Sequence, residues 1–249
     1  MKVLILAGGF GSRLSEYTKD IPKPMVIIAN KPILWHIMSH YAYYEHKEFF
    51  IALGYKSQIV INYFKRFEHE ILDSNEECLK IRILENDWII NFIQTGLHTM
   101  TGGRVKRLSK YINDKIFFLT YGDGLSNIDM KKQLDFHKKN KKLVTISAVR
   151  PPARFGFLQI EGDEVKSFRE KSQLDEGWIN GGFFIIHKDF INYIQDDTTF
   201  LEKEPLIYAS KINELYAYKH KNFWQCMDTQ RDKENLEKII KKINLPWIK

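Results

Sequence analysis

Near the N-terminus the chain reads Leu4-Ile5-Leu6-Ala7-Gly8-Gly9-Phe10-Gly11-Ser12-Arg13, and Ile21-Pro22-Lys23-Pro24-Met25 follows shortly after. The apolar run at residues 3–7 predicts a short buried strand, which three glycines within four positions bring to an end. Glycine lets backbone N–H groups approach an anion without an intervening side chain. Arg13 places a positive charge at the end of this turn and Lys23 a second one shortly after, so the two segments together predict a phosphate-binding site.

Two widespread phosphate-binding loops do not match this segment. A dinucleotide-binding fingerprint requires a third glycine where this chain has Leu14. A P-loop requires a lysine directly after its last glycine, where this chain has Ser12. From these residues alone, an ordinary glycine turn after a strand remains the alternative.

The remaining motifs follow in a characteristic order along nearly the whole chain. They read Lys31-Pro32-Ile33-Leu34-Trp35-His36, Thr101-Gly102-Gly103-Arg104, Thr120-Tyr121-Gly122-Asp123-Gly124, Arg154-Phe155-Gly156, Ile179-Asn180-Gly181-Gly182 and Phe223-Trp224-Gln225-Cys226-Met227-Asp228. Together with the glycine segment and Pro22-Lys23-Pro24-Met25, this series resembles the sugar-phosphate nucleotidyltransferase family. It is most similar to the glucose-1-phosphate cytidylyltransferase branch of that family.

Composition limits the classes of protein to which the chain can belong. Its 249 residues are 44% hydrophobic and suit one large folded domain. No apolar run is long enough to span a bilayer, no signal peptide opens the sequence, and two distant cysteines predict no disulfide framework. The net charge of +7 is spread over solvated lysines and suits polyanionic small substrates. We therefore expect a cytoplasmic protein with neither nucleic acid nor membrane as a partner.

The apolar pattern predicts an α/β fold with a mostly parallel, Rossmann-like sheet and helices on both faces. Strands are expected at residues 3–7, 48–53, 80–85, 116–121 and 144–149, with helices at 33–44, 59–66 and 130–139 between them. A smaller C-terminal α+β region follows, with strands at 156–160, 165–170, 181–186 and 214–218 and helices at 188–193, 204–211 and 232–242. We treat the chain as a single domain, 1–249, with a nucleotide-binding half at 1–150 and an acceptor-binding half at 151–249.

Three polar residues become site candidates from their positions alone. Asp123 lies between two glycines at the end of a predicted strand, where its carboxylate would suit Mg²⁺. Asn180 precedes Gly181, so its amide could donate to and accept from a ligand that approaches closely. Tyr121 could present its hydroxyl group to an acceptor or simply pack. Because ligands bind beyond the carboxyl ends of parallel strands, the Asp123 motif and the glycine segment are expected to meet at one site.

The resemblance assigns further roles. It implies that Asp228 is a second metal ligand, that a loop with Thr101, Gly103 and Arg104 helps to hold the nucleotide, and that Glu170 and Lys171 bind the acceptor together with Tyr121, Asn180 and Gly181. Nucleotide binding would otherwise fall to Leu6, Ala7, Gly8, Gly9, Gly11, Ser12, Arg13 and Lys23. Arg13, Lys23 and Asp123 are the expected catalytic residues.

These residues lead to the hypothesis of nucleotidyl transfer from CTP to a phosphorylated acceptor, with Mg²⁺ as cofactor and glucose 1-phosphate as the first choice of acceptor. UTP or dTTP, another sugar phosphate, or a non-sugar phosphate such as a phosphorylated amino acid remain alternatives. A nucleotide-binding protein without catalytic activity is a further alternative, which the retained Arg13, Lys23 and Asp123 disfavour. The resemblance also implies a homo-oligomer.

Overall fold

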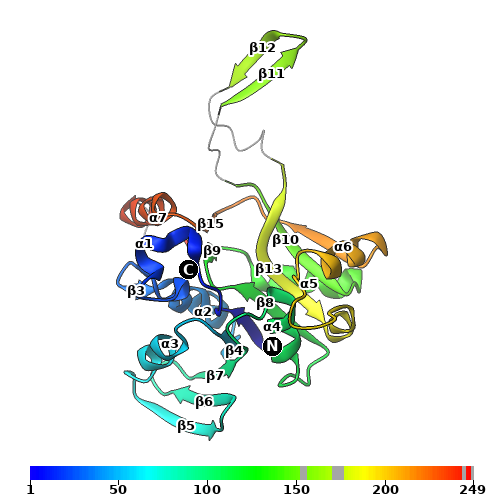
Figure 1. Cartoon of the computed structure of the whole chain (residues 1–249). Helices are drawn as coiled ribbons and strands as arrows, with labels where there is room; N and C mark the ends of the chain where they lie inside the picture. The colour runs from blue at the N-terminus through cyan, green and yellow to red at the C-terminus, as the bar shows by residue number, and fades with distance from the viewer. Residues whose placement is uncertain (152–155, 170–176, 243–244, 248–249) are drawn as a thin grey trace.

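The computed structural model describes residues 1–151, 156–169, 177–242 and 245–247. Its centre is a nine-stranded sheet (Figure 1). From edge to edge the strands are β14 (Leu215–Lys219), β10 (Val144–Val149), β13 (Ile179–His187), β8 (Ile116–Tyr121), β1 (Val3–Leu6), β4 (Glu48–Leu53), β7 (Trp88–Gln94), β6 (Cys78–Ile83) and β5 (His69–Ser74).

Most of these strands point the same way. The four central strands β8, β1, β4 and β7 pair in parallel, as do β10 and β14. Only β13 and β6 run against their neighbours within this sheet, since each pairs antiparallel on both sides. The predicted mostly parallel sheet is therefore confirmed.

Strand β1 shows how the sheet is covered on both faces. All four of its residues are buried, with Val3 and Ile5 in one apolar cluster and Leu4 and Leu6 in another. Successive side chains of a strand point to opposite faces, so these two clusters are the two sides of the sheet. A strand covered on both sides reads as a continuous apolar run, which is why it could be predicted from the sequence.

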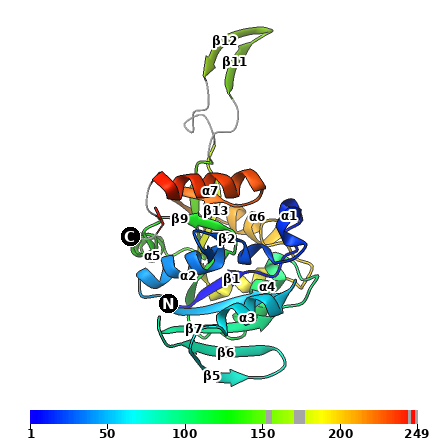
Figure 2. The same cartoon turned by 90° about the vertical axis from the view of Figure 1, so that its left-hand side faces the viewer.

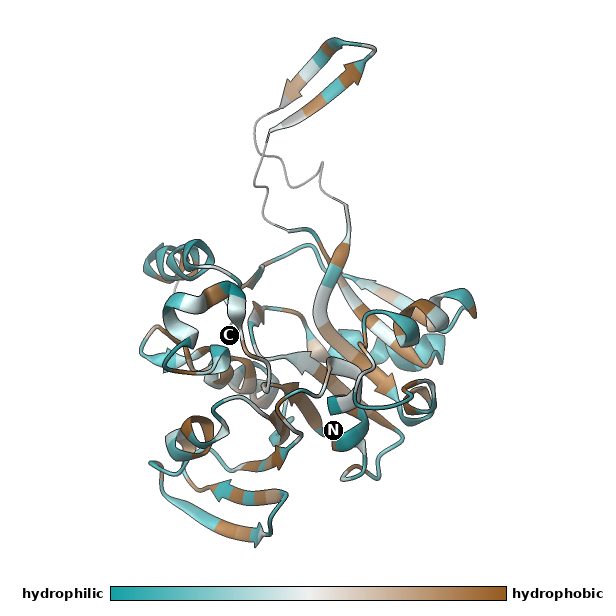
Figure 3. Ribbon diagram, in the orientation of Figure 1, coloured by the Kyte–Doolittle hydropathy of each residue, from teal (hydrophilic) through white to brown (hydrophobic). Residues whose placement is uncertain are grey.

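Helices pack on both faces of the sheet, as predicted (Figures 1 and 2). Residues of α2 (Ile33–Tyr43), α3 (Ser57–Phe64), α5 (Met130–Asn140) and α7 (Gln230–Lys242) join the cluster that contains Val3. Residues of α4 (Thr101–Ser109), α6 (Glu204–Lys211) and the 3-10 helix η3 (Lys188–Tyr193) join the cluster that contains Leu4. Hydropathy follows this layering, because brown apolar segments gather in the centre of Figure 3 and teal segments at the periphery.

Short elements complete the fold. They are α1 (Ser15–Thr18), the 3-10 helices η1 (Ser12–Leu14) and η2 (Lys23–Met25), and the strand pairs β2 (Ile27–Ile28) with β3 (Lys31–Pro32), β9 (Gly124–Ser126) with β15 (Trp224–Cys226), and β11 (Phe157–Glu161) with β12 (Glu164–Arg169). The hairpin of β11 and β12 stands apart from the sheet in both views (Figures 1 and 2). Within the described residues, no helix has both the length and the apolar character needed to cross a membrane.

The sequence did not predict every element correctly. The helix predicted at residues 188–193 is present as a 3-10 helix, and β5 and β7 were not predicted. Thr101–Ser109 is a helix, although the Thr101-Gly102-Gly103-Arg104 segment was expected to be a loop. Two glycines in a first turn weaken the helical signal, because glycine is a poor helix former. Here packing decides, since the backbone N–H groups of Met100 and Gly102 donate to the carbonyls of Asp197 and Thr199.

Candidate active site

A cavity of about 710 Å³ opens at the edge of the sheet where β1 and β8 end. These strands are parallel neighbours, with Leu6 opposite Tyr121, so the segments that follow them leave the sheet side by side. The cavity is lined by both the glycine segment and the Gly122-Asp123-Gly124 turn. The expectation that these two motifs meet at one site is confirmed. The volume falls within the range of ordinary small-molecule sites.

Two later segments reach the same cavity for topological reasons. Strand β13 runs antiparallel to β8, so its first residues, among them Asn180, lie at the edge where β8 ends. Strand β15 pairs with β9, and the Met227 N–H donates to the Asp123 carbonyl over 2.9 Å. This pairing carries Asp228 to Asp123, although the two residues are far apart in the sequence.

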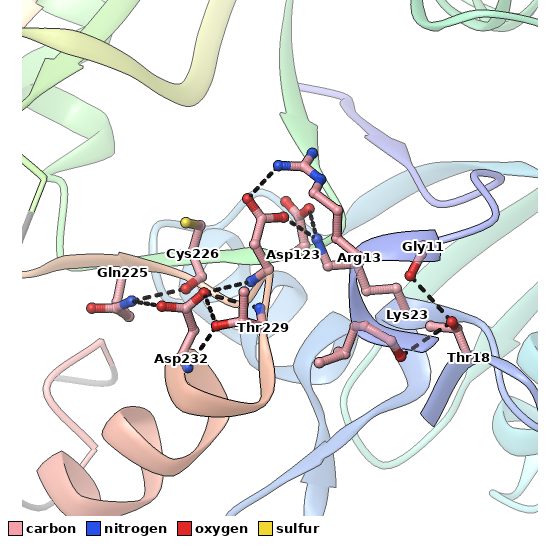
Figure 4. A network of polar contacts seen from close by, with 11 residues as sticks. Gly11, Arg13, Thr18, Lys23, Asp123, Gln225, Cys226, Thr229 and Asp232 are labelled. Carbon is pink, nitrogen blue, oxygen red and sulfur yellow. Dashed lines mark hydrogen bonds and ion pairs between the residues drawn. The ribbon is translucent and has the colours of Figure 1, made fainter. Parts of the chain in front are cut away.

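Lys23 connects the two carboxylates. Its Nζ lies 2.6 Å from Asp123 Oδ2 and 2.6 Å from Asp228 Oδ1, and Figure 4 shows the Lys23–Asp123 contact. Lys23 is buried. It is the first residue of η2, and Pro24 follows it in the first turn of this 3-10 helix. Burial by itself would lower the pKa of this lysine, but Asp123 and Asp228 outweigh burial and raise it. Lys23 therefore carries its positive charge at neutral pH, at a fixed point of the cavity.

Arg13 adds a second positive charge at the rim. Its guanidinium donates to Asp228 Oδ2 over 2.9 Å, and its side chain is 76% exposed. An exposed ion pair of this kind contributes little to stability. Arg13 can therefore exchange this carboxylate for another anion at small energetic cost.

Asp228 is not the residue that caps the following helix. Thr229 and Asp232 exchange hydrogen bonds across the start of α7, because the Asp232 N–H donates to Thr229 Oγ1 and the Thr229 N–H donates to Asp232 Oδ2. This is a capping box, a hydrogen-bond arrangement that stabilises the N-terminus of a helix. The N-cap residue of α7 is therefore Thr229 and not the preceding Asp228. The Asp228 carboxylate is thereby left to the cavity.

Arg104 of α4 lines the cavity and also supports the glycine segment. Arg104 is 4% exposed, and its guanidinium donates to the carbonyls of Gly8 and Leu53 and to the Thr95 hydroxyl. Burial lowers the pKa of Arg104 to about 10, and repulsion by Arg107 contributes to this shift, so the group remains charged at neutral pH. A Cβ on Gly8 would lie only 2.1 Å from Arg104 Nη1, so the close approach requires glycine there.

Thr101 and Gly103 belong to the same predicted nucleotide-binding segment as Arg104, but they differ in their position relative to the cavity. Thr101 lines the cavity. Gly103 is not among the described lining residues, and a Cβ there would lie 2.5 Å from Asp197 Cα. This glycine lets the segment around Asp197 pack closely on α4. The expectation that Gly103 helps to hold the nucleotide stays a prediction.

Several other predicted residues line the same cavity. They are Leu6, Ala7, Gly8, Gly9, Gly11, Ser12, Tyr121, Asn180 and Gly181. The Asn180 amide donates to the Tyr121 hydroxyl over 3.4 Å, and the Trp224 indole donates to the Gly181 carbonyl over 2.7 Å. The predicted acceptor-binding residues Glu170 and Lys171 lie outside the residues that the structure describes.

The sequence reasoning missed Glu202. This residue lines the cavity, and its carboxylate accepts from the Tyr121 and Thr101 hydroxyls over 2.5 and 2.7 Å. Burial, together with the Glu202 charge, raises the pKa of Tyr121 well above its usual value and keeps the phenol protonated. Glu202 stands in a charged run with Lys203 and Glu204, which reads as solvated surface, so no local signal distinguished it.

The carboxylates of Asp123 and Asp228 fit a hard cation such as Mg²⁺. They converge on one point, which Lys23 Nζ occupies. Within the described part of the chain, no group of three or more metal-ligating side chains is present. Mg²⁺ commonly takes one or two carboxylates and completes its shell with water and substrate phosphates, so two are sufficient. The nearby Cys226 is no competing nucleophile, because burial, with a contribution from Asp228, raises its pKa to about 12.

Comparison with known sequences places these residues in context. The nucleotidyl transferase family matches residues 2–232 of the chain. Glucose-1-phosphate cytidylyltransferase of Salmonella typhi is 44% identical over 253 residues, which cover 99% of this chain and 98% of the relative. A protein of Bacillus subtilis named probable glucose-1-phosphate cytidylyltransferase is 39% identical over 252 residues, 99% of each chain.

Solved structures agree with the fold. HddC from Yersinia pseudotuberculosis, in a complex with GMP-PN, superposes with a TM-score of 0.70 at 28% identity and covers 95% of this chain and 98% of its own. A UDP-glucose pyrophosphorylase complexed with UDP-glucose has a TM-score of 0.69 at 17% identity, covers 97% and 98% of the two chains, and supports the fold alone. The family match over nearly the whole length, together with full-length relatives well above 30% identity, shows that this chain belongs to the nucleotidyl transferase family of enzymes.

Proposed function

We propose that this enzyme transfers the cytidylyl group of CTP to glucose 1-phosphate, with CDP-glucose and pyrophosphate as products. The choice of substrates rests on the two full-length relatives that carry the name glucose-1-phosphate cytidylyltransferase. The observation that carries the chemistry is the contact of Lys23 with Asp123 and Asp228 in the cavity lined by the glycine segment. Phosphate-binding backbone, fixed cations and paired carboxylates in one cavity are what a phosphoryl-transfer site requires.

In the proposed reaction, an oxygen of the acceptor phosphate attacks the α-phosphorus of CTP. The bond from this phosphorus to the bridging oxygen of the β-phosphate breaks, and pyrophosphate leaves with the electron pair. The acceptor phosphate is already ionised at neutral pH, so the protein needs no general base. Its contribution is to position the reactants and to stabilise the charge that develops on the phosphoryl oxygens.

The charges of the cavity suit this task. Two positive groups, Arg13 and Lys23, pair here with two negative groups, Asp123 and Asp228. A triphosphate would compete with the carboxylates for both cations, and the released carboxylates would then be available to a divalent cation. Asp123 and Asp228 are the residues that would hold Mg²⁺, which supplies charge neutralisation at the phosphates. Lys23 would then donate directly to a reacting phosphate group.

Substrate choice is tested with the purified protein on a matrix of nucleotides and acceptors. CTP, UTP, dTTP and GTP are each combined with glucose 1-phosphate, a second sugar 1-phosphate and a phosphorylated amino acid, and pyrophosphate release is measured. We expect CTP with glucose 1-phosphate to give the highest kcat/KM and a product with the mass of CDP-glucose. A higher kcat/KM with any other pair would contradict the proposal.

The role of Lys23 is tested by Lys23→Ala. Loss of one fixed donor to a developing charge typically lowers kcat by about 10²–10³-fold. Lys19→Ala serves as the control, because Lys19 is an exposed lysine that does not line the cavity. Circular dichroism of both variants should match the wild type. Near-normal turnover of Lys23→Ala would remove Lys23 from the reaction.

The role of Asp123 is tested by Asp123→Asn, with Asp20→Asn, at an exposed position outside the cavity lining, as the control. We expect the Mg²⁺ concentration for half-maximal rate to rise in Asp123→Asn alone. Binding of Mn²⁺ in the presence of CTP, followed by electron paramagnetic resonance, gives a second readout that does not depend on turnover. Unchanged Mg²⁺ dependence would exclude Asp123 as a ligand.

A further inference from the structure

Glu202 differs from the other carboxylates of the cavity. The described lining contains three carboxylates, of which Asp123 and Asp228 are paired with Lys23 and Arg13. Glu202 forms no ion pair with a described residue and receives hydrogen bonds from two neutral hydroxyl groups. It is also exposed to the solvent of the cavity. Among the described residues, its negative charge is therefore held in place without being neutralised.

The carboxylate is fixed by contacts on both sides. Thr101 Oγ1, at the start of α4, donates to Oε2 over 2.7 Å and accepts from the Leu201 N–H over 2.9 Å. The Tyr121 hydroxyl, at the end of β8, donates to Oε1 and accepts from the Asn180 amide. Glu202 thus ends a chain of hydrogen bonds that runs from Asn180 through Tyr121.

This arrangement leaves acceptor capacity toward the cavity. An ionised carboxylate offers about four lone-pair sites, and the described residues use two of them. The free sites can take a hydroxyl donor, whereas a phosphate group beside an unneutralised carboxylate would be repelled. Glu202 therefore suits the hydroxyl-bearing part of an acceptor and not its phosphate.

We infer that Glu202 accepts a hydrogen bond from a hydroxyl group of the acceptor and selects polyhydroxylated acceptors over phosphates without such a group. The inference rests on the proposed function and adds a specificity-determining residue to it. Tyr121 acts as a positioning residue, since its hydroxyl orients the carboxylate through Oε1. A hydrogen bond from a neutral hydroxyl to a charged acceptor corresponds to about 10- to 100-fold in kcat/KM.

The test combines Glu202→Gln with the four deoxy analogues of glucose 1-phosphate that lack the 2-, 3-, 4- or 6-hydroxyl group. In the wild type, we expect one analogue to lose about 10- to 100-fold in kcat/KM relative to glucose 1-phosphate. In Glu202→Gln, glucose 1-phosphate itself loses a similar factor, and the same deoxygenation causes little further loss. The KM for CTP stays unchanged. Glu204→Gln is the matched control, an exposed glutamate at the first residue of α6 that does not line the cavity.

Two further measurements separate recognition from folding. A merely structural role for Glu202 would lower the Tm and raise the KM of both substrates, without dependence on any one hydroxyl group. Tyr121→Phe should raise the KM of the acceptor while it leaves the KM of CTP unchanged. The inference would be overturned if each deoxy analogue lost the same factor in kcat/KM in Glu202→Gln as in the wild type. A higher kcat/KM of the wild type for a phosphorylated amino alcohol than for glucose 1-phosphate would also overturn it. Absence of CTP turnover with glucose 1-phosphate in the wild type would instead overturn the proposed function.

Discussion

At the scale of single residues, Gly8 and Gly9 have different reasons to be glycine. A Cβ on Gly8 would lie 2.1 Å from Arg104 Nη1, whereas a Cβ on Gly9 would meet no described atom within 4 Å. The protein itself therefore requires glycine at position 8 and not at position 9. Since Gly9 lines the cavity, we predict that its missing side chain allows the close approach of a ligand.

The two substitutions to alanine should separate these reasons. We expect Gly8→Ala to displace Arg104 and to lower the free energy of unfolding by about 1–3 kcal/mol, as overpacking does. Gly9→Ala should leave stability within about 0.5 kcal/mol but raise the KM for CTP by about tenfold or more. Urea denaturation and steady-state kinetics on both variants test this pair. An unchanged KM for CTP in Gly9→Ala would contradict the assignment of Gly9 to nucleotide binding.

At the scale of elements, α5 packs on β10 through a buried polar contact. His137 Nδ1 of α5 lies 2.9 Å from Thr145 Oγ1 of β10, and the His137 side chain is 3% exposed. Burial, with a contribution from His187, lowers the pKa of His137 from its ordinary 6.5 to about 4. Between these two values the unfolded chain binds a proton that the folded protein does not, so stability falls as the pH falls.

This contact predicts a pH dependence of stability. His137 should have no effect above about pH 7 and should cost roughly 2 kcal/mol at pH 5, with the loss growing down to about pH 4. His137→Gln removes the titrating group, so the difference in unfolding free energy between pH 7.5 and pH 5 should shrink by about that amount. Parallel profiles for wild type and variant over this range would contradict the prediction. His46, whose pKa burial and the N-terminal amino group lower to about 4, should still titrate in both proteins.

At the scale of the whole molecule, Trp247 packs the C-terminal segment against the rest of the protein. This indole is 1% exposed, lies edge-on to His36 of α2 and contacts Phe223, which stands just before β15. The Trp247 carbonyl also contacts His40 Nδ1 over 3.1 Å. The C-terminal segment thus joins a helix on one face of the sheet to the strand that leads to Asp228.

Trp247→Ala should therefore destabilise the protein without changing its chemistry. Loss of a buried tryptophan side chain typically costs about 3–5 kcal/mol, which corresponds to a fall in Tm of roughly 10 °C for a chain of this size. Well below the transition, kcat should stay within about twofold of the wild type, because Trp247 does not line the cavity. A large drop in kcat at constant Tm would show that the indole acts on the site and not on the fold.

The nine-stranded sheet extends across the boundary expected at residue 150, because β10 pairs with both β13 and β14. Residues from before and after that boundary line the same cavity. A division of labour between a nucleotide-binding and an acceptor-binding half stays a prediction, as does assembly into a homo-oligomer.

The elements that could be predicted have a local cause. Strands at 48–53, 116–121 and 144–149 coincide with β4, β8 and β10, since a run of apolar residues marks a strand buried on both faces. Helix α4 could not be predicted in the same way. Its two N-terminal glycines are tolerated because the segment around Asp197 packs against them, and that partner lies about ninety positions further along the chain.

The sequence by itself determined the class of fold, the glycine segment and the charged residues that a phosphate site requires. Tertiary structure alone decided how those charges are paired. Lys23 meets Asp123 and Asp228 across 100 and 205 positions, because parallel strands bring their ends to one edge and β15 pairs with β9. The same physical reason explains Glu202: a glutamate in a charged run becomes part of a site only when folding places it beside Thr101 and Tyr121.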